Sequence, residues 1–193
     1  EERQVTLGEE SFPLPNPFLV LATQNPLEQE GTFPLPEAQM DRFLFKLKVD
    51  YPSHAEEVEV LRRADGREEP VRPVLDESSV LQAGRLASQV RLDEAIRDYI
   101  VRLVGATRVG HGRTWKGKEL LRCGASPRAG LALQAAAKAQ ALIVGRDHVL
   151  PDDVIALAPD VLRHRLLLTY EAEADGVSTD EVIRNLLGAV PRP

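Results

Sequence analysis

Cysteine occurs only once among the 193 residues, as Cys123, so the chain cannot form an internal disulfide. Proteins of a reducing compartment commonly lack disulfides, and we therefore expect a cytoplasmic location. Long apolar runs are absent too, because none approaches the roughly 18 residues that a membrane span needs. The formal net charge of −6 argues against a general nucleic-acid or membrane-surface binder, since both need a basic face.

The sequence also lacks the patterns of several catalytic centres. Its four histidines show no metal-ligand spacing, and Cys123 has no catalytic residue near it in the sequence. The octapeptide GRTWKGKE, residues 112–119, resembles a phosphate-binding P-loop but ends in Glu119, where that loop needs Ser or Thr for the metal. We interpret it as a solvated basic loop. Asp76 and Glu77 follow too short an apolar run to be a metal-binding pair at the end of a strand.

The first 52 residues have the pattern of an α/β layer. Alternating apolar residues on either side of Gly8, within residues 4–14, predict a β-hairpin. Residues 18–23, FLVLAT, predict a strand that is buried on both faces of a parallel sheet. Residues 43–49, FLFKLKV, predict a second strand, and a short helix is expected before it, starting at Pro36. Because a hairpin and two strands cannot bury a sheet alone, we expect further strands upstream of Glu1.

From residue 53 onward the pattern becomes helical. Ser53 and Glu56 have the spacing of a capping box, as do Ser178 and Glu181. The predicted helices cover residues 55–64, 76–88, 92–104 and 126–145, a segment after Ser178, and two short segments opened by Pro151 and Pro159. The predicted fold class is therefore an α/β fragment of a hairpin plus parallel strands in residues 1–52, followed by a mostly α-helical domain in residues 53–193.

Three polar residues stand where ligand chemistry is expected, and each has a plainer alternative. Asn25 follows the predicted strand 18–23, and open α/β sheets bind ligands beyond the carboxyl ends of such strands; Asn-Pro also commonly starts a turn. Arg42 either clamps a phosphate with its planar fork or is a surface charge. Arg128 lies at the second position of a predicted helix, where the dipole disfavours a cation unless an anion is near; the alternative is a side chain that extends into solvent.

Two stretches together resemble the MoxR family of AAA+ ATPases. The stretch ERQVTLGEESFPLPNPFLVLATQNPLEQEGTFPLPEAQMDRFLFK is similar to the family's pre-sensor hairpin, sensor-1 strand and arginine-finger segment. The stretch GASPRAGLALQAAAKAQALIVGRDHVLPDDVIALAPDVLRHRLLLTYEAEADGVS is similar to its lid domain with sensor 2. The resemblance implies the C-terminal portion of a P-loop AAA+ core in residues 1–52 and a helical lid domain in residues 53–193.

The resemblance also implies a role for each of the three polar residues. Asn25 matches sensor 1, which orients the attacking water and contacts the γ-phosphate of ATP. Arg42 matches the arginine finger, which reaches the nucleotide of the neighbouring subunit. Arg128 matches sensor 2, which reaches the phosphates from the lid. The implied cofactors are ATP and Mg²⁺; no Walker A or Walker B motif occurs in these residues, and we expect both, with the metal site, upstream of Glu1.

The function implied by the resemblance is ATP hydrolysis coupled to chaperone-like remodelling or maturation of other proteins. Such ATPases act as homo-oligomers, commonly hexamers, often with proteins that carry a von Willebrand factor A domain. Without the Walker motifs we expect the 193-residue chain alone to be inactive. The alternative, from another class, is a non-catalytic assembly module that only mediates subunit contacts. A P-loop and an acidic Walker B strand in the upstream sequence would decide for the ATPase.

Overall fold

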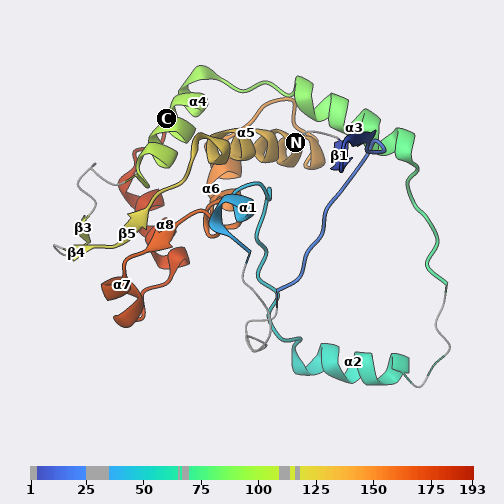
Figure 1. Ribbon diagram of the computed structural model, residues 1–193, viewed down its shortest axis with the longest axis horizontal. Coiled ribbons are helices and arrows are strands. Elements are labelled where there is room, and N and C mark those ends of the chain that lie inside the picture. Colours follow the sequence, from blue (N-terminus) through green and yellow to red (C-terminus); the bar gives the residue numbers. More distant parts are fainter. Residues whose placement is uncertain (1–3, 25–34, 65, 67–69, 109–113, 116–117) are drawn as a thin grey trace.

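The computed structural model describes residues 4–24, 35–64, 66, 70–108, 114–115 and 118–193 (Figure 1). The chain opens with the predicted antiparallel hairpin, strands β1 (Gln4–Leu7) and β2 (Glu10–Pro13). Gly8 lies in the turn between them with φ = 64°, a left-handed conformation that glycine adopts without strain. The hairpin prediction is therefore confirmed.

Residues 18–23 and 43–49, both described in the structure, do not form the two further strands that were predicted for them, so this prediction is wrong. Neither segment forms strand pairing, and Leu19 and Leu21 are 78% and 86% exposed. A strand needs a neighbouring strand to satisfy its backbone groups, and no described strand lies beside residues 18–23. Residues 43–49 bond to the helical part instead: the backbone N–H of Lys46 donates to the carbonyl of Asp160 over 2.9 Å.

Eight helices lie within the described ranges, and the predicted ones, except a helix opened by Pro159, are found close to their expected bounds. They are α1 (Glu37–Met40), α2 (His54–Ala64), α3 (Glu77–Gln89), α4 (Glu94–Gly105), α5 (Pro127–Ile143), α6 (Pro151–Leu162), α7 (Tyr170–Ala174) and α8 (Thr179–Ala189). Both predicted capping boxes form: the Ser53 and Ser178 backbone N–H groups donate to their glutamates over 2.7 and 2.9 Å. None of these helices is long and apolar enough to cross a membrane.

Helix α5 lies at the centre of the helical part and contacts α3, α4 and α6, while α6 also packs against α8 (Figure 1). Its inward face is made largely of alanines, among them Ala129, Ala136 and Ala137, whose small side chains let the neighbouring helices approach closely. Larger side chains from α4 and α6, including Tyr99, Leu103 and Leu162, are fully buried around it. Helix α2, by contrast, has no buried residue.

Pro159 was predicted to open a helix, and this prediction is wrong because Pro159 lies inside α6. A proline there removes one backbone hydrogen bond. The helix continues through it because Val154, Ala158, Val161 and Leu162 on the same helix are fully buried in the core. Burial of that apolar face outweighs the local preference of proline for a helix start.

Short strands that the sequence did not predict complete the structure. Strand β5 (Leu121–Cys123) pairs antiparallel with β6 (Leu167–Leu168), and β3 (Thr114–Trp115) pairs with β4 (Lys118–Glu119). The β5–β6 pair joins the segment before α5 to the segment after α6. The two ends of the α5–α6 unit are thereby held together on one side of the molecule.

Candidate functional site

Arg128 lies at the start of α5, where the sequence predicted it. Ser126 is the N-cap and its hydroxyl accepts a hydrogen bond from the Arg128 backbone N–H over 3.2 Å, with Pro127 as the first helical residue. The Arg128 side chain is 46% exposed, and its Nη1 lies 3.4 Å from Oδ2 of Asp41. A carboxylate therefore stands near this cation, which reduces the unfavourable interaction of Arg128 with the positive end of the helix dipole.

The loop before α5 is held by a close backbone approach. The backbone N–H of Ala125 donates over 2.9 Å to the buried hydroxyl of Thr107, which in turn donates over 2.7 Å to the Val104 carbonyl in α4. A Cβ on Gly124 would lie 2.2 Å from the Thr107 carbonyl oxygen, so only glycine fits there. The end of α4 thus fixes where α5 begins, and with it the position of Arg128.

Asp41, the C-cap of α1, is the carboxylate at which several elements meet. Its Oδ2 accepts from the Ser126 hydroxyl over 2.8 Å, and its Oδ1 accepts from Nε of Arg165 over 3.0 Å. Burial opposes the charge of Asp41, but the hydrogen bonds from Ser126, Arg165 and Arg128 outweigh it and lower its pKa. Asp41 is therefore an anion held between α1, the start of α5 and the segment after α6.

Arg165 follows α6, and its side chain is only 3% exposed. Besides Asp41 Oδ1, its guanidinium donates to the backbone carbonyls of Asp41 at 3.0 Å, Phe43 at 2.6 Å and Leu44 at 3.3 Å, and to that of Val161 in α6. A buried guanidinium is tolerated only when its donors are satisfied. Arg165 thus binds three carbonyls of the short turn that contains Arg42.

Arg42 itself lies in the turn after α1, between Asp41 and Phe43, and is exposed. Its backbone N–H donates to the Gln39 carbonyl over 3.2 Å. His164 Nε2 lies 3.0 Å from the Phe43 carbonyl, and burial lowers the pKa of His164, so the neutral ring donates this bond. The backbone around Arg42 is therefore fixed on the helical part while the Arg42 side chain faces outward.

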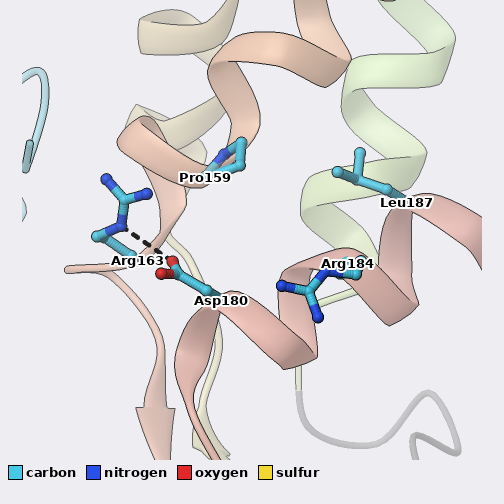
Figure 2. Close-up of a pocket in the computed structure, with 5 residues that line it drawn as sticks. All are labelled: Pro159, Arg163, Asp180, Arg184 and Leu187. Carbon is cyan, nitrogen blue, oxygen red and sulfur yellow. Dashed lines mark hydrogen bonds and ion pairs between the residues drawn. The ribbon is translucent and has the colours of Figure 1, made fainter. Parts of the chain in front are cut away.

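Residues 41–48, which we call the connecting segment, are also held at their far end. Arg163 donates to the Lys46 carbonyl and to Asp160, and its Nε lies 3.0 Å from Asp180 Oδ1, an ion pair seen in Figure 2. Lys48 pairs with the same Asp180. Figure 2 shows a pocket here between α6 and α8, lined by Pro159, Arg163, Asp180, Arg184 and Leu187. Within this pocket the charge of Arg163 is balanced by the carboxylates of Asp160 and Asp180.

The other residues and motifs singled out from the sequence contribute little to this geometry. Asn25 lies outside the described residues, as do residues 112, 113, 116 and 117 of the GRTWKGKE stretch, whose other four residues form β3 and β4. No group of three or more metal-ligating side chains occurs among the described residues. The structure thus brings Arg128 together with Asp41, the residue before Arg42, and leaves the position of Asn25 as a prediction.

Sequence reasoning missed Asp41, His164 and Arg165. A signal was available in the stretch DVLRHRLLL, residues 160–168, where three basic side chains interrupt an otherwise apolar run. Because buried basic residues need acceptors, this stretch predicts that a carboxylate or free backbone carbonyls lie next to it. Nothing in the sequence indicates that acceptors of His164 and Arg165 lie more than 120 residues earlier.

Comparison with known proteins bears on this arrangement. Residues 117–186 match the model of the AAA lid domain, and residues 1–45 match that of the "ATPase family associated with various cellular activities (AAA)". The chain is 47% identical to Chaperone MoxR1 of Mycobacterium tuberculosis and 33% identical to Protein MoxR of Methylorubrum extorquens. In both comparisons all of this chain is aligned, whereas 52% and 60% of those two relatives are covered.

A solved structure agrees in fold. A crystal structure from Cytophaga hutchinsonii, described as a candidate ATPase, matches with a TM-score of 0.90 and 44% sequence identity. The match covers 98% of this chain and 58% of the solved chain. The chain therefore spans between about half and three fifths of the length of the proteins to which it is similar.

Proposed function

This chain belongs to the MoxR family of AAA+ ATPases, and we propose that in the full-length protein it supplies residues to two ATP sites. In this proposal Arg128 acts as sensor 2 at the ATP site of its own subunit. Arg42 acts as the arginine finger at the site of the neighbouring subunit, and Asn25 acts as sensor 1. The boundary between the core portion and the lid domain is proposed to lie between residues 52 and 53.

The observation that carries this proposal is the contact that places Arg128 beside Asp41, the residue directly before Arg42. Arg128 contacts Asp41 over 3.4 Å, and Arg42 is the next residue after Asp41. Both side chains are substantially exposed, whereas the backbone of each is held by buried groups: Thr107 fixes the start of α5, and Arg165 fixes the turn of Arg42. Cations that extend outward from a rigid scaffold suit recognition of a phosphate chain.

The donor set of the described residues fits ATP phosphates but not a metal. Arg42 and Arg128 supply fixed cations, and the amides at the start of α5 favour negative charge. The described residues offer no carboxylate cluster for Mg²⁺, so we propose that the metal is held by Walker residues upstream. ATP bound with Mg²⁺ would supply the transferable phosphoryl group, while Arg128 of the same subunit and Arg42 of the neighbouring subunit would orient it and balance its charge.

We further propose that the full-length protein couples hydrolysis to chaperone-like remodelling of other proteins, as a cytoplasmic homo-oligomer. AAA+ proteins are typically oligomeric, and a finger that acts on a neighbouring subunit requires a ring. The name of the relative Chaperone MoxR1 supports the chaperone-like role. A hexameric ring and proteins with a von Willebrand factor A domain as partners are proposed from the family resemblance.

The isolated 193-residue chain should neither hydrolyse ATP nor bind it tightly. Phosphoryl transfer depends mostly on the P-loop amides, its lysine and the metal, and none of these groups is contributed by the described residues. The chain alone would supply only the sensing and finger residues.

Replacement of Arg42 tests the proposal in the full-length protein. An arginine finger is worth about 10³ to 10⁵ in rate, so Arg42→Ala should nearly abolish ATP hydrolysis while nucleotide binding and ring assembly survive. Arg184→Ala, which removes another exposed arginine on α8, is the matched control and should keep normal turnover. Near-normal hydrolysis by Arg42→Ala would contradict the proposal and favour a non-catalytic assembly module.

A further inference from the structure

We propose that Asp41 and Arg165 form a clamp that fixes the Arg42 turn to the lid. Through this clamp, movement of the lid in one subunit would reposition Arg42 at the ATP site of the next subunit. The inference rests on the proposed function, because it assumes that Arg42 is the finger and Arg128 the sensor. It assigns Asp41 and Arg165 as positioning residues, which act through Arg42 and touch no nucleotide themselves.

The first argument is the geometry of Arg165. Its guanidinium binds the carboxylate of Asp41 and the carbonyls of Asp41, Phe43 and Leu44, which lie on both sides of Arg42. The same guanidinium donates to the Val161 carbonyl in α6. Since the Arg165 side chain is 3% exposed, water does not replace these bonds. The turn of Arg42 therefore follows any displacement of the end of α6.

The second argument is the link from this clamp to Arg128. Asp41 Oδ2 accepts from the Ser126 hydroxyl over 2.8 Å and lies 3.4 Å from Nη1 of Arg128. The same Ser126 hydroxyl accepts from the Arg128 backbone N–H. A phosphate chain near Arg128 would compete with Asp41 for the guanidinium, because charge-assisted hydrogen bonds to phosphate are strong. Nucleotide in one site would thereby alter the contacts of the residue that precedes the finger.

The third argument is that the connecting segment and the lid move together. Lys46 bonds to Asp160 and Arg163, and Lys48 pairs with Asp180 in α8. Helix α6 packs against both α5 and α8 around a continuous apolar core. Close-packed helices shift as units rather than deform continuously. Residues 41–48 are therefore attached to the lid at both ends, and Arg42 is carried with them.

Asp41→Asn in the full-length protein tests the clamp. The substitution keeps the shape of the side chain but removes its charge, which weakens the bonds from Arg165 and Ser126. Because a misplacement of roughly 1 Å can cost about 10²-fold in rate, kcat should fall about 100-fold while the affinity for ATP is retained. Asp153→Asn is the matched control: the Asp153 side chain is 7% exposed, against 17% for Asp41, and it accepts from Arg146 over 2.9 Å and from the Leu150 backbone N–H over 2.8 Å, away from the connecting segment. It should lose stability without a comparable loss of kcat.

Mixed rings show whether the defect lies in the subunit's own site or in its neighbour's. Asp41→Asn subunits keep their own Walker residues, and subunits without the Walker B carboxylate keep a correctly held finger. Interfaces that combine these two intact halves should hydrolyse ATP at the normal rate, so mixing should raise turnover above the average of the two separate variants. A purely structural role of Asp41 gives no such increase.

The possible outcomes distinguish a failure of the clamp from a failure of the proposed function. If Arg42→Ala is inactive and Asp41→Asn keeps normal kcat, the clamp is wrong and the proposed function stands. If Asp41→Asn is slow and mixing yields no increase, the defect is in its own site and the clamp is again wrong. Near-normal turnover of Arg42→Ala overturns the proposed function itself. Arg165→Lys, which keeps the charge but loses the planar fork, replaces Asp41→Asn if the latter does not assemble; failure of both to form rings would make the pair merely structural.

Discussion

Replacing Gly124 by alanine should displace the start of α5 at a large cost in stability. The added Cβ would lie 2.2 Å from the Thr107 carbonyl oxygen and 2.7 Å from Cα of Arg108, and both are backbone atoms that cannot rotate away. Overpacking costs about 1 to 3 kcal/mol where a core can adjust. Moving the two segments apart would also break the buried hydrogen bond of 2.9 Å from the Ala125 N–H to the Thr107 hydroxyl. The loss of this bond adds about 1 to 3 kcal/mol. We expect a total loss of about 2 to 6 kcal/mol in the free energy of unfolding.

Urea unfolding of the 193-residue chain, followed by circular dichroism, measures this cost. Gly130→Ala is the control, because its Cβ would lie 3.8 Å from Ile100 Cγ2 in ordinary contact and the residue is helical. That control should gain up to about 1 kcal/mol, since alanine favours a helix over glycine. A loss below about 1 kcal/mol for Gly124→Ala would refute the close approach that positions Arg128.

Two further predictions concern Arg128 and His164. In the full-length protein, Arg128→Ala should weaken the nucleotide-induced closure of the lid, measured by protease protection, while the helices stay folded; closure like that of the wild type would make Arg128 a surface charge. Burial lowers the pKa of His164 below 6.5, so the folded state resists a proton that the unfolded chain accepts. The stability that depends on His164 should be complete above about pH 6.5 and be lost as the pH drops from there to the lower folded-state pKa. His164→Gln should flatten this dependence in urea titrations; an unchanged slope would show that His164 does not cause it.

Local signals in the sequence were sufficient to predict where several of the helices begin. Ser126 with Pro127, and the capping boxes at Ser53 and Ser178, predicted helix starts that the structure confirms. These signals succeed because the cap side chain and the backbone N–H that donates to it lie within three residues of each other. The same local reasoning placed Arg128 at a helix start, and the structure confirms this position.

Predictions that depended on distant residues failed or were not made. The strand predicted at 18–23 lacks a neighbour among the described residues, so its apolar side chains are exposed. Pro159 continues a helix because buried neighbours outweigh its local preference. The clamp of Asp41 by Arg165 joins residues 124 positions apart, and no period or motif within the sequence indicates such a pair. Such long-range ion pairs can be identified only from the packed arrangement of the helices.

Arg42 is proposed to complete an ATP site in the neighbouring subunit, and mixed rings of the full-length protein measure whether it does so. Arg42→Ala subunits lack the finger and should be inactive alone, as should subunits without the Walker B carboxylate. Rings that contain both should recover part of the hydrolysis, because some interfaces then pair an intact finger with intact Walker residues. A mixture that stays inactive although labelled subunits demonstrably exchange would show that Arg42 does not act at the ATP site of the neighbouring subunit.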